Sequence, residues 1–169
     1  MHMSMPNRKP LRLTDYDYSA PGAYFVTICT HEKACLFGRI IPAADKVGAY
    51  VQYSPIGRMA RECLLDIASH YDNVRVDHWV IMPNHIHMLV QITERIDSQS
   101  GMRCDISNVV GKYKAAVTRK IGKARLPSGK LWQTSFYDHV IRNQEDYLSI
   151  WQYIDGNPSK WLEDCFCSE

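Results

Sequence analysis

The chain has 169 residues, of which 46% are hydrophobic and 22% charged, a balance typical of one globular domain with a full apolar core. Residues 1–10 hold no apolar run of signal-peptide length, and no stretch approaches the roughly 18 uninterrupted apolar residues of a membrane span, so we expect a cytoplasmic protein without membrane partners. The net charge of +2 at pH 7 is too small to indicate a class of partner by itself.

The cysteines do not suggest a disulfide framework. None of the six forms a C-x-x-C pair, and without an export signal we expect reduced thiols. They are Cys29, Cys35, Cys63, Cys104, Cys165 and Cys167.

We expect a single domain over residues 1–169, with an N-terminal arm at 1–20 and a short tail at 162–169. The arm is basic, and its cations could contact nucleic acid. These cations are Arg8, Lys9 and Arg12.

The first elements of the domain are a strand and a helix. Residues 23–30 are rich in β-branched and aromatic side chains and predict a strand, with residues 36–41 pairing with it as a short hairpin. Ser54 and Pro55 then supply an N-cap and a first-turn proline, and the apolar spacing that follows predicts a helix to about His70.

Two histidines lie on one face of a predicted strand. Residues 74–82 form one strand, Pro83 and Asn84 turn the chain, and His85 opens the next strand. Because side chains alternate along a strand, His85 and His87 point one way while their apolar neighbours point into the core. Their Cβ atoms are then about 6 to 7 Å apart, close enough for both rings to bind one metal ion.

A basic helix follows the histidine strand. From Asp105, an apolar stripe predicts a helix to about residue 123, and no acidic residue occurs between Asp105 and Asp138. A stretch of one charge sign favours a polyanion such as nucleic acid, although a solvated helix face is the alternative. The cations are Lys112, Lys114, Arg119, Lys120, Lys123, Arg125 and Lys130.

The last predicted elements are a strand at residues 136–141 and a helix capped by Asn143. The helix has an apolar stripe, whose members are Tyr147, Ile150, Trp151 and Ile154. A separate row holds Ser149, Tyr153 and Asn157, each four residues from the next. If this helix packs beside the histidine strand, it presents a phenol and an amide oxygen to the two imidazoles, a donor set that suits a divalent ion with open positions.

The element order in the centre of the chain is β-α-β-β-α-β. It predicts an α+β fold, namely a ferredoxin-like α/β sandwich in which an antiparallel sheet has helices on one face. An additional C-terminal helix carries the tyrosine, and the uncovered sheet face can form the floor of a site.

Several blocks of the sequence resemble one family. Residues 82–90, which read MPNHIHMLV, resemble the HUH motif (histidine, bulky apolar residue, histidine) of single-tyrosine transposases. The blocks LWQ at 131–133, FYDHVIRN at 136–143, DY at 146–147, YI at 153–154 and NP at 157–158 resemble the REP-associated tyrosine transposase branch of that family. They occur in the family's order over residues 74–161.

The resemblance implies a metal-dependent endonuclease and transposase that cuts and rejoins single-stranded DNA beside hairpins, using Mg²⁺ or Mn²⁺. It implies that His85 and His87 are metal ligands, that Asn157 is a third ligand, and that Tyr153 is the nucleophile. Attack by Tyr153 would leave a 5′-phosphotyrosine intermediate and a free 3′-hydroxyl.

His139 lies in a matched block without an assigned role. We favour a structural or DNA-contacting role over metal ligation. Members of the family act as monomers or as homodimers, and the sequence does not choose between the two.

Two alternatives remain open at this stage. The first is a domesticated, non-catalytic DNA-binding protein of the same fold, which would bind DNA without forming a covalent adduct. The second is a hydrolase in which His85, His87 and His139 hold Zn²⁺ and water attacks, so that activity would survive Tyr153→Phe.

Overall fold

The computed structural model describes residues 16–44, 48–95, 104–122, 126 and 129–164. Its strands are β1 (Gly22–Cys29), β2 (Gly38–Pro42), β3 (Ala49–Tyr53), β4 (Val74–Ile81), β5 (His85–Ile92) and β6 (Tyr137–Ile141). Its helices are α1 (Pro55–Leu65), α2 (Ile106–Ile121) and α3 (Gln144–Asp164), with short 3-10 helices η1 (His31–Lys33) and η2 (Ile67–His70).

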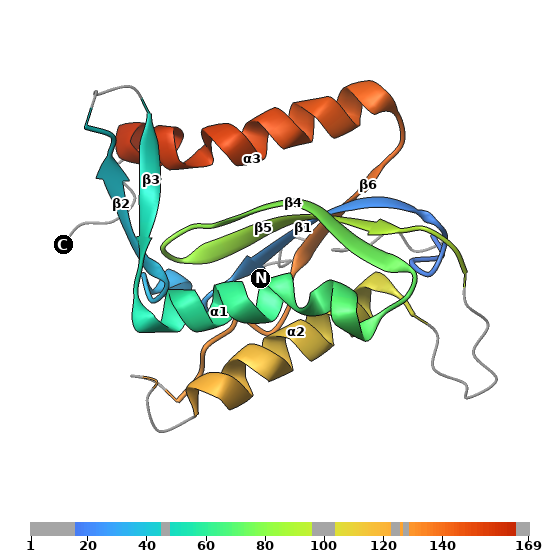
Figure 1. Ribbon diagram of the computed structural model, residues 1–169, viewed down its shortest axis with the longest axis horizontal. Coiled ribbons are helices and arrows are strands. Elements are labelled where there is room, and N and C mark those ends of the chain that lie inside the picture. The colour runs from blue at the N-terminus through green and yellow to red at the C-terminus, as the bar shows by residue number, and fades with distance from the viewer. Residues whose placement is uncertain (1–15, 45–47, 96–103, 123–125, 127–128, 165–169) are drawn as a thin grey trace, which may run out of the picture.

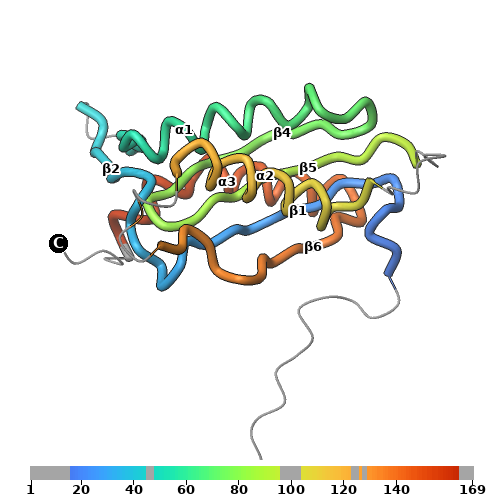
Figure 2. Tube along the Cα trace, turned by 90° about the horizontal axis from the view of Figure 1, so that it is seen from below, coloured from blue at the N-terminus to red at the C-terminus, as the bar shows by residue number. Residues whose placement is uncertain are grey.

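Four strands form one sheet in the order β4-β5-β1-β6, and each neighbouring pair is antiparallel. Helices α1 and α2 cover one face of this sheet, and α3 lies across the opposite face (Figure 1). Figure 2, turned by 90° to show the molecule from below, shows the four strands in the same order, with α1 and α2 on the viewer's side of the sheet. The predicted ferredoxin-like sandwich and its additional C-terminal helix are therefore confirmed.

The two faces of β5 have different neighbours, as the alternation of its side chains predicts. Ile86, Met88 and Val90 belong to the main apolar core beneath α1 and α2. Leu89 belongs to a second cluster, which includes the buried Ile154 of α3. The face that carries the histidines therefore lies under α3.

All three long helices begin at polar caps, of which Ser54 and Asn143 were predicted from the sequence. The Ser54 hydroxyl accepts a hydrogen bond from Gly57 N (3.0 Å), and the Asp105 carboxylate accepts one from Asn108 N (2.9 Å). The Asn143 side-chain oxygen accepts one from Asp146 N (2.8 Å). The predicted apolar stripe of α3 packs on the sheet, which confirms its role.

The predicted pairing of residues 36–41 with the first strand is wrong. β1 has β5 on one edge and β6 on the other, so it has no free edge for a third partner. β2 instead pairs with β3 in a separate two-stranded sheet. This hairpin stands beside the end of α3 (Figure 1), where Ile40 and Val51 join the cluster under the helix.

The cysteines follow the expectation only in part. Cys29, Cys63 and Cys104 carry free thiols. Cys35 is disulfide-bonded, so the expectation of reduced thiols is wrong there. Within the part of the chain that the structure describes, no helix is both long and apolar enough to cross a membrane.

Candidate active site

The two histidines of β5 lie side by side on the sheet face beneath α3. Their ring centroids are 4.5 Å apart, and the rings are inclined at 68°. His87 is only 5% exposed, and His85 is partly buried. The strand therefore presents both imidazoles to one small volume, as the sequence predicts.

Hydrogen bonds on the Nδ1 atoms orient both rings. Asn84 donates from Nδ2 to the Lys33 carbonyl (3.2 Å), which directs its Oδ1 to His85 Nδ1 at 2.8 Å. That oxygen can only accept, so His85 carries its proton on Nδ1 and has a lone pair on Nε2. The Nδ1 atom of His87 lies 2.8 Å from the Thr27 hydroxyl, which can also accept.

The Nε2 atom of His87 is buried and has no hydrogen-bond partner among the residues that the structure describes. An unpaired buried polar atom is uncommon and calls for an explanation, such as a missing ion. A metal-ligating histidine usually binds through one ring nitrogen while the other donates to a neighbouring acceptor. Thr27 and Asn84 are placed as such acceptors for the two rings.

Both imidazoles are held in the neutral form that binds metal ions. Burial lowers the pKa of His85 to about 4, with a smaller contribution from the Lys33 ammonium, while a hydrogen bond with the Asn157 side chain acts in the opposite direction. Burial, followed by the neighbouring His85, lowers the pKa of His87 to about 3. At neutral pH no proton therefore competes with a metal ion for the lone pair of either imidazole.

Tyr153 projects from α3 toward the histidine pair. Its ring centroid lies 5.3 Å from that of His87, and the side chain is 42% exposed. Phe25 on β1 stacks on His87 at 5.1 Å and contacts Tyr153 edge-on at 5.9 Å. Phe25 therefore packs against both rings.

Asn157 lies one helical turn beyond Tyr153 and is 8% exposed. Its Nδ2 donates to the Tyr153 carbonyl at 3.3 Å, and its side chain is close enough to His85 to raise the pKa of that imidazole. The structure thus brings together all four residues that the sequence assigns to the centre of the site. Their chemical roles stay predictions.

Two lysines near this centre were missed by the sequence analysis. Lys160 places its Nζ 5.5 Å from the centroid of the Tyr153 ring. Lys33 is exposed in η1 and near enough to act on His85 electrostatically. The seven-residue spacing of Lys160 from Tyr153, two helical turns, could have indicated the first. The second depends on the fold, which brings η1 beside the turn before β5.

The backbone at Lys33 is unusual. Glu32 and Lys33 both have left-handed conformations, with φ of 53° and 55°, which few residues other than glycine adopt. The Lys33 carbonyl accepts the Asn84 bond described above, and Lys33 N donates to the Thr30 carbonyl at 3.2 Å. Strained backbone of this kind concentrates at functional sites.

The predicted DNA-binding residues of α2 lie on the other side of the sheet from the histidines (Figure 1). Lys112 covers the Tyr71 ring at 5.0 Å, Lys114 donates to the Gln133 carbonyl at 2.6 Å, and Lys120 pairs with Glu62 at 2.6 Å. Lys130 is exposed. The other predicted contacts, Lys123, Arg125, Arg8, Lys9 and Arg12, lie outside the described residues.

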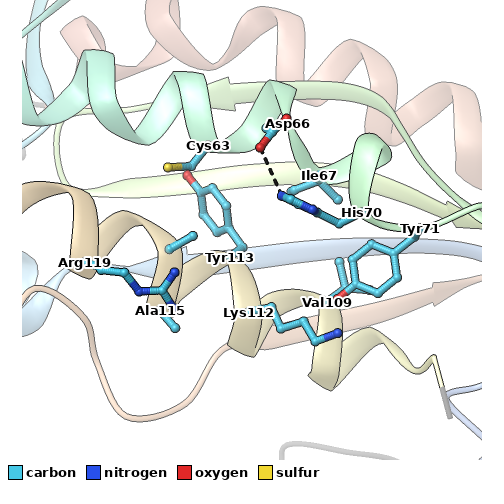
Figure 3. Close-up of a pocket in the computed structure, with 11 residues that line it drawn as sticks. Cys63, Asp66, Ile67, His70, Tyr71, Val109, Lys112, Tyr113, Ala115 and Arg119 are labelled. Carbon is cyan, nitrogen blue, oxygen red and sulfur yellow. Dashed lines mark hydrogen bonds and ion pairs between the residues drawn. The ribbon is translucent and has the colours of Figure 1, made fainter. Parts of the chain in front are cut away.

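A cavity of about 370 Å³ opens between α1, η2 and α2. Figure 3 shows Lys112 and Arg119 on its α2 wall, opposite the hydrogen-bonded pair Asp66 and His70. Tyr113 closes the floor and donates to the Ala60 carbonyl at 3.1 Å. The cavity contains none of the residues around the histidine pair.

His139 does not join the histidine pair. Its Nε2 bonds to the Asp146 carboxylate at 2.8 Å. Among the described residues no group of three or more histidine, cysteine, aspartate or glutamate side chains is placed to hold a metal ion. The zinc hydrolase with three histidine ligands is therefore not supported.

Comparisons with known proteins identify the family of the chain. The profile of the transposase IS200-like family matches residues 49–157. A protein of Haemophilus influenzae, described only as uncharacterized, is 34% identical over 172 residues, which cover 94% of this chain and 92% of the relative. The REP-associated tyrosine transposase of Escherichia coli is 31% identical over 90 residues, covering 52% of this chain and 47% of that protein.

A solved structure shares the fold. It is that of a REP-associated tyrosine transposase bound to a REP hairpin, with a TM-score of 0.57 at 22% identity, covering 88% of this chain and 74% of the other. The resemblance found in the sequence is confirmed: the chain is homologous to REP-associated tyrosine transposases and belongs to the IS200-like transposase family.

Proposed function

We propose that this protein cleaves and rejoins single-stranded DNA through a covalent link to Tyr153. The observation that carries the proposal is the position of the Tyr153 ring, 5.3 Å from a buried histidine whose Nε2 atom has no partner in the described structure. The proposed nucleophile and a ring nitrogen without a partner in the described structure therefore lie close together. Membership of the IS200-like transposase family supports this reaction class.

The covalent step conserves the energy of the phosphodiester. Tyr153 Oη attacks the phosphorus, and the bond from phosphorus to the 3′ oxygen breaks. The phenol loses one proton, and the departing 3′ oxygen gains one to become a hydroxyl. The product is a 5′-phosphotyrosine with a free 3′-hydroxyl. Attack by a different 3′-hydroxyl reverses the step and joins two strands without ATP.

We propose Mg²⁺ or Mn²⁺ as the cofactor, held by His85 and His87 through Nε2 and by Asn157 through its amide oxygen. The residues fit such an ion because both imidazoles are neutral, their Nδ1 atoms face acceptors, and His87 Nε2 is buried without a partner in the described region. When bound, the ion would polarise the scissile phosphate and offset the charge that develops on its oxygens.

We propose single-stranded DNA next to a hairpin as the substrate. A structural relative was solved with a REP hairpin, which supports a hairpin ligand for this chain. Among the described residues, Lys160 beside Tyr153 and Lys33 beside His85 are placed to hold phosphates on either side of the cut. Because Tyr153 packs on the histidines of its own chain, we also propose that one chain forms a complete site.

The test is to incubate the protein with end-labelled hairpin DNA from its own genomic neighbourhood, with Mn²⁺ or with EDTA, and to separate the products on a denaturing protein gel. We expect a metal-dependent adduct in the wild type and none in Tyr153→Phe, which keeps the ring contacts. A matched control is Tyr137→Phe, an exposed tyrosine on β6. Cleavage without an adduct, or an adduct in Tyr153→Phe, would overturn the proposal, and binding with neither product would indicate a non-catalytic DNA-binding protein.

A further inference from the structure

Two histidines outside the proposed metal site lie at opposite edges of the sheet, on the face beneath α3. His78 on β4 pairs in register with Leu89 on β5, and Leu89 pairs with Phe25 on β1. Phe25 pairs in turn with His139 on β6. One row of side chains thus crosses all four strands, with a histidine at each end.

Each of these histidines bonds to an aspartate of α3. His78 Nε2 donates to Asp155 Oδ1 at 2.6 Å, and His139 Nε2 donates to Asp146 Oδ2 at 2.8 Å. The aspartates are nine residues apart, or about 13.5 Å along a helix. Three gaps between four strands also span about 14 Å. The helix segment between the two bonds therefore reaches from one edge of the sheet to the other.

The bond on β4 has additional support close to the proposed nucleophile. The His78 ring stacks on Trp151 with centroids 4.1 Å apart and planes inclined at 5°. Tyr147 donates to the carboxylate of Asp77, the neighbour of His78, at 2.9 Å. Trp151 and Asp155 are the positions two residues before and after Tyr153, so β4 holds the helix on both sides of the tyrosine.

Apolar packing alone fixes the position of α3 poorly, because the hydrophobic effect is not directional. A slip of one helical turn is about 5.4 Å. A movement of that size would take the Tyr153 ring out of contact with His87, from which it is now 5.3 Å away. Hydrogen bonds between fixed groups are directional, and two of them at separate points resist both sliding and swinging of the helix.

We propose that His78 and His139 are positioning residues that fasten the tyrosine helix at both sheet edges and so hold Tyr153 over the histidines of β5. The inference rests on the proposed function for its effect on activity, but the fastening of α3 can be measured without it. Each bond contributes to this fastening at its own edge of the sheet, so the effects of removing them should multiply.

The experiment uses Asp155→Asn to weaken the bond on β4 and His139→Ala to remove the one on β6, singly and combined. Glu163→Gln is the matched control, since it also removes one negative charge from an exposed position on α3. The readouts are the rate of adduct formation at saturating hairpin DNA with Mn²⁺, the dissociation constant for that DNA, and hydrogen exchange of α3 without DNA.

We expect each single change to slow adduct formation about threefold, and the pair about tenfold, with DNA affinity within twofold of the wild type. Amides of α3 should exchange faster, while those of α1 and α2 keep their rates. Unchanged rates and exchange, as in the control, would overturn the proposal, as would a loss of affinity instead of rate. If the wild type forms no adduct, the proposed function fails, and hydrogen exchange alone still decides whether the two bonds fasten the helix.

Discussion

The Tyr153 ring on α3 lies 5.3 Å from the His87 ring on β5, although the two residues are far apart in the sequence. The contact exists because α3 crosses the sheet face that the other helices leave open (Figure 1). Phe25 packs against both rings and keeps them in a fixed relation. The tyrosine and the histidines therefore lie against one another, and the proposed role of each can be tested separately.

Replacing His87 should remove metal binding without removing the fold. We expect His87→Gln to weaken Mn²⁺ binding at least about tenfold, since even residues that only orient a ligand contribute this much. Titration calorimetry at pH 7 measures the affinity. His70→Gln is the control, because His70 is exposed and is bonded to Asp66 on the side of the sheet that α1 and α2 cover. Equal affinities in His87→Gln and the control would show that the histidine pair is not the metal site.

The two sets of basic residues should contribute differently to binding of a short unstructured DNA strand. Removing Lys33 and Lys160 by alanine substitution should weaken binding about tenfold, since two exposed charge contacts contribute about 0.7 kcal/mol each. The double change Lys112→Ala with Arg119→Ala removes the same charge, but from the opposite side of the sheet, and should change the affinity less than twofold.

Filter binding at several salt concentrations checks this comparison. The slope of log K against log salt should fall by about 1.4 for the first pair, since a single strand gives about 0.7 per phosphate contact. The α2 pair should reduce affinity only for a longer strand with a hairpin, where its predicted DNA contacts would apply. If the α2 pair weakened binding of the short strand more than the Lys33 and Lys160 pair, the short strand would bind on the α2 side of the sheet.

Local periodicity predicted the parts of the fold that depend on a single element. The alternation along β5 placed both histidines on one face, and the apolar stripe of α3 identified the side that packs on the sheet. The row of Tyr153 and Asn157 indicated that both could face the imidazoles if the helix packs beside the histidine strand, and the family resemblance assigned their roles. The alternation and the stripe follow from the geometry of one strand and one helix.

Features that depend on which elements become neighbours could not be obtained in this way. The pairing of β2 with β3 is determined by the occupied edges of β1, which no local pattern reveals. Lys33 reaches the site only because the chain after β1 returns beside the turn before β5. The His78 and His139 bonds to α3 likewise depend on strand order, so sequence alone did not identify the aspartate partner of either histidine.

The stability of the metal-free protein should fall as the pH is lowered below about 6.5. The pKa values of His85 and His87 are lowered on folding from 6.5 to about 4 and about 3. Between these values and 6.5 the unfolded chain takes up protons that the folded protein excludes, so acid favours unfolding, whereas above 6.5 neither state binds them. Between pH 6.5 and 5 each histidine should contribute about 2 kcal/mol to this loss.

Urea unfolding in EDTA at pH 7 and pH 5 measures the effect. The double variant His85→Gln with His87→Gln retains the other titrating groups, so its smaller loss of stability isolates the contribution of the pair. The same pH dependence in the wild type and the double variant would show that the imidazoles are protonated in the folded protein at pH 5.

Two helical glycines should respond in opposite ways to alanine. A Cβ atom at Gly57 in α1 would lie 1.9 Å from the carbonyl oxygen of Phe37. That carbonyl cannot move away freely, because it accepts a hydrogen bond from Ser54 N at 2.9 Å. Gly57→Ala should therefore destabilise the protein by about 3 kcal/mol.

Gly111 in α2 has open space where its Cβ would lie, and Gly111→Ala should stabilise the protein by up to about 1 kcal/mol because alanine favours the helix. Urea unfolding of both variants measures the two changes, and a Gly57→Ala protein as stable as the wild type would mean that α1 does not approach Phe37 this closely.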